Sequence, residues 1–248
     1  MEELVRVSKL MSERGICSRR EADRFIKQQL VEADGVKITT LGTKVSPNAK
    51  IKLLEKGEQL QREKISIVVH KPIGYVSSQA EKGYSDVKEL LIPKNQWPKQ
   101  TEKILQEKQL RFLAPAGRLD IDSSGLLLLT LDGRVAKQVI GEHSSVEKEY
   151  LVRVDGTISP KMIQQLQFGL TLDGKPLKRA KVKECAPQLL QIILKEGKKR
   201  QIRRMCELVG LHVLSLKRVR IGSILLGNLP SGKWRFFTPS PTTFSNRS

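Results

Sequence analysis

An acidic loop directly before a long apolar run is the part of the sequence best suited to chemistry. Asp120 lies between Gly117 and Gly125, two glycines that permit tight turns of the backbone. The following residues 126–130 have the continuous apolar pattern of a strand buried on both faces. A carboxylate on a short loop beside a rigid strand is held in a defined place, and Arg118 favours its charged form. Such a carboxylate can serve as a nucleophile or as an electrostatic stabiliser.

The residues of this loop also allow two other interpretations. Aspartates in loops commonly close a turn through their own backbone, and Asp120 or Asp122 could do no more than this. As a pair, the two carboxylates could hydrolyse a sugar linkage. A sugar hydrolase, however, explains neither the formal net charge of +19 nor the aromatic content of only 4%.

The charge balance indicates a polyanionic partner. The chain has 45 lysines and arginines against 26 aspartates and glutamates, an excess that attracts nucleic acid or an anionic surface. RNA or DNA is the first candidate. No apolar stretch approaches the length needed to span a bilayer, and the first residues lack the order of a signal peptide. We therefore expect a cytoplasmic protein with no membrane partner.

The cysteines and histidines do not form a metal-binding pattern. Cys17, Cys185 and Cys206 show no Cys-x-x-Cys spacing, and no histidine lies near them as a ligand pair would. A Gly-rich phosphate loop and a dinucleotide-binding fingerprint are also missing from the sequence. We expect neither a metal nor a cofactor. Isolated cysteines fit a reducing compartment, which agrees with the cytoplasm.

The elements that position these residues are expected to form two domains. Residues 1–56 change from helical to strand-like periodicity and form a small basic domain. Residues 57–64 are polar, lack apolar periodicity and are predicted to be a linker that lets the small domain move. Residues 65–237 form the larger domain, and the polar tail 238–248 is expected to be disordered.

Two helices are predicted at the start of the small domain. Val7, Leu10 and Met11 form one helical stripe, and Ser18 with Glu21 has the spacing of a capping box that opens a second helix. Basic residues line one face of the second helix and can meet phosphates, although a solvated helix face has the same pattern. They are Arg20, Arg24 and Lys27.

The larger domain is predicted to have an α+β fold. Strand and helix signals do not alternate as regular βαβ units, so we expect a mixed, mostly antiparallel sheet with helices packed on it. Strands are expected at 67–69, 126–130, 150–154, 189–194 and 219–226, and helices at 160–168 and 200–209. Residues 93–109, rich in Lys, Gln and Glu, are predicted to be a surface insertion.

Several strings together resemble a known family. Gly117-Arg-Leu-Asp120 is similar to the signature of the RsuA-type pseudouridine synthases, and Gly15-Ile-Cys-Ser-Arg-Arg-Glu-Ala-Asp23 resembles an S4-type RNA-binding domain. Val69-His-Lys-Pro-Ile-Gly-Tyr75 resembles the family's entry motif, and residues 218–235 resemble its closing segment. The motifs follow the family's order over nearly the whole chain. Within the family they look most like the F-type branch of the large-subunit ribosomal RNA synthases.

The resemblance implies three catalytic residues and no cofactor. Asp120 takes the place of the catalytic carboxylate, and Tyr150 that of an aromatic residue on which the base stacks. The alternative is a strand tyrosine buried for packing, but with aromatic residues at only 4% of the chain the functional role is favoured. Arg203 takes the place of an arginine that pairs with the catalytic aspartate and holds it ionised. The expected RNA contacts are Arg19, Arg20, Arg24, Lys27, Lys71, Arg118, Arg200 and Arg204.

Two positions depart from the family pattern. His70 stands where asparagine is usual, which puts a hydrogen bond from this position in doubt. Asp34 replaces asparagine before Gly35. Aspartate still supports a tight turn, so we expect the fold to survive, although the added negative charge weakens a nearby RNA contact.

The resemblance predicts an RNA pseudouridine synthase that acts on a uridine in structured RNA. Large-subunit ribosomal RNA is the expected substrate, with transfer RNA as a further one. The alternative is a non-catalytic ribosomal RNA-binding or assembly factor, which would not need Asp120, Tyr150 and Arg203 together. We expect a monomer without an obligate protein partner.

Overall fold

Alternating apolar side chains at the centre of the large sheet build a core on each of its faces. In β10 (Ser124–Thr130), the side chains of Leu126 to Leu129 are all fully buried. Leu127 and Leu129 join the larger apolar cluster, whereas Leu126 and Leu128 join a smaller one on the opposite face. The computed structural model describes residues 3–78, 83–98, 104–141, 144–240 and 243–244.

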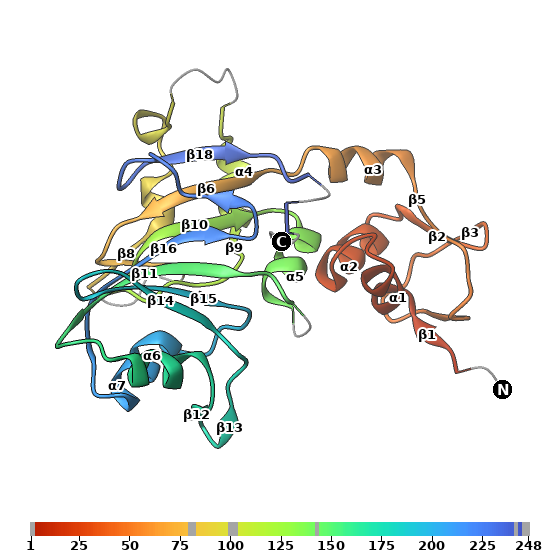
Figure 1. Cartoon of the computed structure of the whole chain (residues 1–248). Coiled ribbons are helices and arrows are strands. Elements are labelled where there is room, and N and C mark those ends of the chain that lie inside the picture. The colour runs from red at the N-terminus through yellow and green to blue at the C-terminus, as the bar shows by residue number, and fades with distance from the viewer. Residues whose placement is uncertain (1–2, 79–82, 99–103, 142–143, 241–242, 245–248) are drawn as a thin grey trace.

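The large sheet is mixed and mostly antiparallel, as predicted. Its nine strands follow the order β14-β15-β11-β16-β10-β6-β18, with β17 paired to β16 and β9 paired to β10 (Figure 1). Within this sheet, only the described pairing of β10 with β16 is parallel. The other strands are β6 (Ser66–Lys71), β9 (Ala114–Pro115), β11 (Lys148–Asp155), β14 (Lys181–Ala186), β15 (Leu189–Leu194), β16 (His212–Ile221), β17 (Ile224–Leu225) and β18 (Trp234–Phe237).

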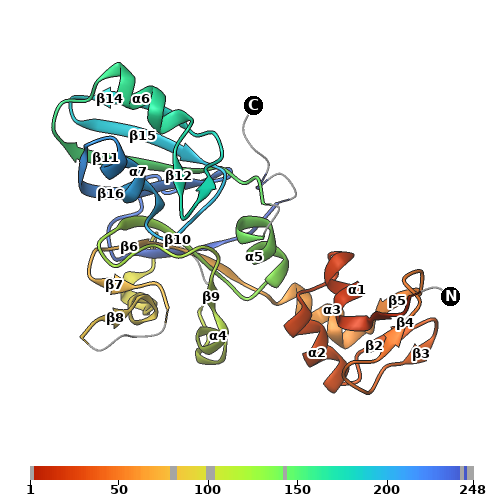
Figure 2. The same ribbon diagram turned by 90° about the horizontal axis from the view of Figure 1, so that it is seen from below.

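Helices cover both faces of this sheet (Figure 2). On one face, α5 (Gly133–Ile140) buries Val135 and Val139 in the smaller cluster. On the other, α6 (Pro160–Gln167) and α7 (Gln201–Leu208) bury Leu166, Ile202 and Met205 in the larger one. These two helices lie within one or two residues of their predicted positions, and the α+β prediction is confirmed.

The strand expected over residues 219–226 is wrong. β16 begins at His212 and ends at Ile221, and the chain then turns before the short β17. Gly222 adopts φ +55° in this turn, and a Cβ at Gly222 would lie 2.6 Å from the carbonyl oxygen of Thr243. A reversal hidden inside an apolar run therefore needs glycine at this position.

The small domain is built as the sequence predicts. The capping box is present, because the Ser18 hydroxyl accepts from the Glu21 amide at 3.4 Å and the Glu21 carboxylate accepts from the Ser18 amide at 2.8 Å. Asp34 (φ +50°) and Gly35 form the predicted turn, and the Asp34 carboxylate also accepts from the Lys50 amide at 2.8 Å. The elements are β1 (Val5–Arg6), α1 (Val7–Glu13), α2 (Arg19–Lys27), β2 (Val31–Ala33), β3 (Val36–Lys37), β4 (Lys44–Val45) and β5 (Ile51–Leu53).

The segment expected to be a flexible linker is mostly a helix, α3 (Glu55–Arg62), so that expectation is wrong. Contacts fix α3 and the residues that follow it to the small domain. Gln61 donates to the carbonyl oxygen of Ile16 at 2.9 Å, and Lys64 forms an ion pair with Glu21. The helical residues are mostly polar because one side packs while the rest faces water.

The two domains also contact each other directly. Gly133, the first residue of α5, faces α2 so closely that a Cβ there would lie 2.4 Å from Ser18 Cβ. Lys137 donates to the carbonyl oxygen of Ser12 at 2.8 Å, and the guanidinium of Arg24 lies 5.2 Å from the centre of the Phe112 ring. These contacts hold α2 against the larger domain.

Part of the expected disordered tail is packed, which corrects that prediction where the chain is described. Thr243 is 4% exposed, and its carbonyl oxygen accepts from the amide and hydroxyl of Ser223 at 2.8 and 2.9 Å. Residues 241–242 and 245–248 lie outside the described residues.

The described part of the expected insertion borders the edge strand β18. The Trp97 amide donates to the carbonyl oxygen of Trp234 at 2.8 Å, and the Trp234 indole donates to Ile92 at 2.9 Å. Residues 99–103 of this segment lie outside the described residues. The remaining elements are β7 (Tyr75–Val76), β8 (Ser85–Asp86), α4 (Glu107–Phe112), β12 (Thr171–Leu172), β13 (Lys175–Pro176) and the short 3-10 helices η1 (Val87–Leu90) and η2 (Pro93–Asn95). None of the described helices has both the length and the apolar character to cross a bilayer.

The burial of two thiols predicts selective alkylation. Burial raises the pKa of Cys17 and of Cys206 to about 12, whereas Cys185 is exposed. Because the thiolate is the reactive form, iodoacetamide at pH 8 should label Cys185 in the folded protein and spare the other two. Peptide mass spectrometry measures the labelling, with protein unfolded in urea as the control that labels all three. Equal labelling of Cys17 and Cys185 in the folded protein would contradict this burial.

Candidate active site

One row of residues across the sheet brings the separate sequence motifs together. Tyr150 of β11 is paired with Arg218 of β16, Arg218 with Gly125 of β10, and Gly125 with Lys71 of β6. Neighbouring strands lie about 4.8 Å apart, so the row spans roughly 10 Å from Tyr150 to Gly125. The loop that carries Asp120 enters this row at Gly125.

Gly125 is required because β10 and β16 approach each other closely. Its φ is +106°, and a Cβ would lie 2.2 Å from the carbonyl oxygen of Arg218. No side chain fits in that space, and L-residues rarely adopt this backbone conformation. The second glycine noted in the loop therefore permits the parallel contact between β10, which follows the Asp120 loop, and β16, which carries Arg218.

Backbone hydrogen bonds hold the Asp120 loop on both sides. The Ser77 hydroxyl donates to the carbonyl oxygen of Leu119 at 2.7 Å and accepts from the amide of Leu119 at 2.9 Å. The amide of Gly74 donates to the carbonyl oxygen of Ile121 at 2.9 Å. Asp120 itself closes a turn, because its carbonyl oxygen accepts from the Ser123 amide at 3.1 Å. The backbone of Asp120 thus closes a turn, as aspartates in loops commonly do, and this leaves its side chain available for another role.

Lys71 binds the protein's own backbone, which corrects its expected role in RNA contact. Its side chain is fully buried and donates to the carbonyl oxygens of Pro72 and Tyr75 at 2.9 and 2.8 Å, with that of Ile121 at 3.5 Å. Burial lowers the pKa of Lys71 to about 8, and the charges of Asp122 and Asp120 oppose this shift. Lys71 therefore joins the entry motif to the Asp120 loop.

Asp122, not Asp120, is the partner of Arg200, which precedes α7, and of Arg203 within it. Arg200 donates through Nη1 and Nη2 to the two carboxylate oxygens of Asp122 at 3.3 and 3.0 Å, a two-pronged pair. Arg203 Nη2 lies 3.2 Å from the Asp122 carboxylate and donates to the Asp122 carbonyl oxygen at 2.9 Å. Partial burial raises the pKa of Asp122, but these hydrogen bonds and positive charges outweigh it and lower the pKa below its ordinary value.

The expected pairing of Arg203 with Asp120 is therefore corrected. Arg203 Nη1 is also bound to the carbonyl oxygen of Val213 at 3.2 Å, so its guanidinium joins α7 to β16 and to the loop. Its Nε is, within the described part of the chain, the one buried side-chain nitrogen or oxygen atom without a partner. No described side chain is within ion-pair distance of Asp120, which is partly exposed. The loop thus contains one bound carboxylate and one available carboxylate.

Tyr150 lies at the edge of the larger core, 8% exposed, in the same apolar cluster as Leu119. Leu119 directly precedes Asp120, and Ile202 and Met205 of α7 belong to the same cluster. The aromatic ring, the Asp120 loop and the arginine-bearing helix therefore share one face of the sheet. The ring is packed, as the alternative interpretation held, yet it lies beside the candidate carboxylate's loop.

The other expected RNA contacts fall into three groups. Arg200 and Arg204 are ion-paired, the latter with Asp173 at 2.6 Å, while keeping about 43% and 33% of their side chains exposed. Arg24 packs on the ring of Phe112. The remaining expected contacts are exposed without an ion pair among the described residues: Arg19, Arg20, Lys27 and Arg118.

Three residues of the site carry roles that sequence reasoning does not assign to them, in addition to the corrected Lys71 and Arg203. Arg218 is 2% exposed and bonds to the backbone of the Asp120 loop, a role taken up below. Its signal was present, because Leu216, Arg218 and Arg220 alternate along one strand, and two arginines thus occupy positions where apolar residues are expected. Asp122 was considered only as a turn residue or as one of a catalytic pair. Ser77 carries no sequence signal of its role.

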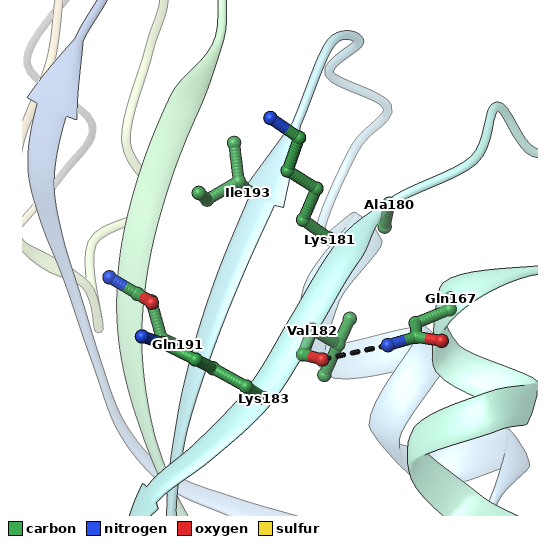
Figure 3. Close-up of a pocket in the computed structure, with 7 residues that line it drawn as sticks. All are labelled: Gln167, Ala180, Lys181, Val182, Lys183, Gln191 and Ile193. Carbon is green, nitrogen blue, oxygen red and sulfur yellow. Dashed lines mark hydrogen bonds between the residues drawn. The ribbon is translucent and has the colours of Figure 1, made fainter. Parts of the chain in front are cut away.

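A shallow hollow of about 420 Å³ lies elsewhere, beside β14 and β15 (Figure 3). Lys181, Lys183 and Gln191 are among the residues that line it, and Gln167 donates to the carbonyl oxygen of Val182 at 2.9 Å. It contains none of the candidate catalytic residues. Within the described residues, no three His, Cys, Asp or Glu side chains gather as metal ligands would.

The pairing of Asp122 predicts a pH-dependent contribution to stability. A carboxylate whose pKa is lowered in the folded state stabilises the fold above its unfolded pKa of about 3.9, and loses this effect as pH falls through the folded pKa. Asp122→Asn should therefore lower the melting temperature at pH 7, and the difference from the natural protein should shrink below about pH 4. Calorimetry across pH measures it. The control is Asp173→Asn, which removes the partner of Arg204. Asp173 is more exposed than Asp122, so its loss should change the melting temperature less.

A difference that stayed constant down to pH 2 would show that Asp122 acts through packing and not through its charge.

Comparison with known proteins places the chain among RNA-modifying enzymes. The dual-specificity RNA pseudouridine synthase RluF of Escherichia coli (strain K12) is 37% identical over 238 residues, covering 94% of this chain and 76% of that protein. The ribosomal large subunit pseudouridine synthase B of Bacillus subtilis (strain 168) is 31% identical over 244 residues, covering 94% and 92% of the two chains. A crystal structure of a pseudouridylate synthase matches the fold with a TM-score of 0.64 at 24% identity, covering 94% of this chain and 96% of that one.

Two family models divide the chain where the structure divides it. Residues 5–51 match the S4 domain, and residues 65–208 match the RNA pseudouridylate synthase domain. The second match begins just before β6 and takes in the Asp120 loop, Tyr150 and Arg203. The chain is an enzyme that belongs to the RNA pseudouridylate synthase family and carries an S4 domain ahead of its catalytic domain.

Proposed function

We propose that this enzyme isomerises a uridine in structured ribosomal RNA to pseudouridine, with Asp120 as its catalytic carboxylate. The observation that carries the assignment is the division between the two aspartates of the loop. Asp122 is held by Arg200 and Arg203, whereas the side chain of Asp120 is partly exposed and has no ion-pair partner among the described residues. A carboxylate in a two-pronged ion pair is occupied, and one fixed by its backbone alone is free to react.

The reaction needs few chemical groups. The bond between C1′ of the ribose and N1 of uracil breaks, the base turns, and a bond from C1′ to C5 forms. C5 then loses its proton and N1 gains one, so substrate and product are isomers and no atom is supplied from outside. Asp120 serves as nucleophile or as stabiliser of positive charge while the base is detached. The ring of Tyr150 provides an apolar surface on which the detached base stacks.

Arg203 has a positioning role in this proposal. Bonds to Asp122 and Val213 fix the far end of the loop to α7 and β16, so the arginine acts on Asp120 through the backbone. Arg200 supports the carboxylate of Asp122 from the solvent side and keeps part of its guanidinium exposed for a phosphate.

The S4 domain is proposed to bind RNA through the exposed basic residues of α2. A positive helix face contacts phosphates without reading sequence, which suits a domain that adds affinity next to a separate catalytic site. The relatives are named for activity on the large ribosomal subunit and for dual specificity. We propose large-subunit ribosomal RNA as the substrate of this enzyme and transfer RNA as a second substrate.

We further propose that the enzyme works as a monomer in the cytoplasm. One chain supplies Asp120, Tyr150 and the arginines of α7. Its three cysteines are free, as a reducing compartment would keep them.

Asp120→Asn should abolish isomerisation and leave RNA binding intact, because the amide keeps the shape of the carboxylate without its charge. Release of tritium from RNA labelled at C5 of uridine measures turnover, and filter binding measures affinity. Asp122→Asn is the matched control and should keep measurable turnover. Substantial turnover by Asp120→Asn, or complete loss only in a folded Asp122→Asn, would transfer the catalytic role to the other carboxylate.

Arg20→Gln and Lys27→Gln should weaken binding to full-length RNA and reduce its dependence on salt. Each lost phosphate contact lowers the slope of log affinity against log salt by about 0.7–0.9. Turnover at saturating RNA should not change. Lys161→Gln on α6 removes an exposed charge outside the small domain and is the control. An unchanged salt slope in both α2 variants would remove α2 from the RNA interface.

A further inference from the structure

β10 changes its neighbour within a few residues, and this leaves a gap in the sheet. At its start it pairs with β16 through Ser124 and Gly125, and at its end it pairs with β9 through Leu129 and Thr130. The pairing of β10 with β16 covers Ser124 and Gly125 alone, and the next backbone donor to β10 on this side is the amide of Ala116, which bonds to the carbonyl oxygen of Leu128 at 2.8 Å. A sheet that opens in this way leaves backbone carbonyl oxygens without strand partners, and each buried one must find a donor.

The side chain of Arg218 fills the gap and supplies those donors. Its Nε donates to the carbonyl oxygen of Leu126 at 2.7 Å, Nη1 to that of Arg118 at 3.3 Å, and Nη2 to that of Gly117 at 3.1 Å. The side chain is 2% exposed, so water does not compete for these bonds. One guanidinium thus joins β10 to the two residues that lead into Leu119 and Asp120.

Arg218 differs from its neighbour Arg220 in the kind of partner it has. Arg220, also buried on β16, pairs with the carboxylates of Glu147 and Glu149 at 3.1 and 2.6 Å. Among the described residues no carboxylate forms an ion pair with Arg218, and the bonds found are all to backbone oxygens. A buried charge costs free energy unless fully bonded, and a planar, rigid donor set fixes the atoms that it binds.

This arrangement links the two proposed catalytic side chains. Arg218 is the direct partner of Tyr150 across β11 and β16, and its guanidinium holds the backbone just before Asp120. Gly117 has φ +92°, a backbone conformation that suits glycine. The chain therefore turns at Gly117, next to the bonds from Arg218, before it reaches Asp120. Arg218 is therefore the side chain that joins the strand facing Tyr150 to the backbone before Asp120.

We propose that Arg218 is a positioning residue that sets Asp120 relative to Tyr150 without touching RNA. The inference rests on the proposed function, since it assumes that Asp120 is the catalytic carboxylate. A misplacement of about 1 Å in a catalytic group can cost on the order of 100-fold in rate. Loosening the loop should thus reduce the chemical step and leave RNA binding unchanged.

The test compares Arg218→Lys with Arg220→Lys in the full-length enzyme. Lysine keeps the charge but loses the planar donor set, so it cannot reach all three carbonyl oxygens together. In Arg218→Lys, kcat should fall on the order of 10- to 100-fold, with KM and the RNA dissociation constant within about twofold. Arg220→Lys should lower the melting temperature and leave kcat within about twofold, since its partners lie away from the loop.

Amide hydrogen exchange supplies a measurement independent of catalysis. Residues 117–123 should exchange faster in Arg218→Lys than in the natural enzyme, while exchange in this segment is unchanged in Arg220→Lys. Unchanged kcat in a folded Arg218→Lys, or unchanged exchange of this segment, would overturn the proposal. A loss confined to RNA affinity would do the same, because it would make Arg218 an RNA contact.

Ser77→Ala tests the same loop if Arg218→Lys does not fold. It removes both bonds to Leu119 from the opposite side and should give the same fall in kcat at constant KM. An unchanged kcat in Ser77→Ala would show that the rate does not depend on the loop's position and would overturn the proposal. Turnover by Asp120→Asn would instead refute the proposed function, and the exchange experiment on Arg218→Lys would still decide whether the loop is held as inferred.

Discussion

The short parallel contact between β10 and β16 is the constraint on which the site depends. It brings the Asp120 loop, at the start of β10, against the strand whose other neighbour carries Tyr150. The contact is possible only because Gly125 has no side chain. Helix α7 packs on the same face and reaches the loop through its arginines. Groups far apart in the chain thus meet where one pair of strands runs together and then separates.

Electrostatics at the site follow a simple division. Buried cations, Lys71 and Arg218, bind backbone oxygens and fix the path of the loop. The cations nearer the surface, Arg200 and Arg203, bind the side chain of Asp122. The partly exposed carboxylate of Asp120 thus lies in a positive environment that is already committed to other partners. These cations therefore fix the loop without occupying the side chain of Asp120.

Patterns with a local cause could be predicted from the sequence. The capping box of Ser18, the Asp34–Gly35 turn and the buried run of β10 depend on neighbouring residues, and the structure contains all three. The mixed sheet followed from the order of strand signals and from the family resemblance. These local elements can be predicted without knowing which residues pack against them.

Features decided by distant partners could not be predicted. Lys71 looked like a phosphate contact because nothing local shows that its side chain is covered on all sides. Arg203 was assigned to Asp120 by resemblance, but two residues further along the loop Asp122 takes the arginine. The sequence of α3 does not show a helix, because the contacts that stabilise it involve residues far away in sequence, such as Ile16. In each case, contacts with residues distant in the sequence decide the role of a side chain or segment, and the local sequence does not show these contacts.

The docking of the small domain fixes the distance between the two places where RNA is proposed to bind. Gly133 allows α2 to lie directly against α5, and α3 is a helix fixed to the small domain. The contacts between the domains therefore set the distance from the basic face of α2 to Asp120. In the proposed function, an RNA that occupies both places presents a phosphate cluster and a reachable uridine at that same spacing. Selectivity of this kind reads the three-dimensional shape of the RNA and needs no contact with the edges of its bases.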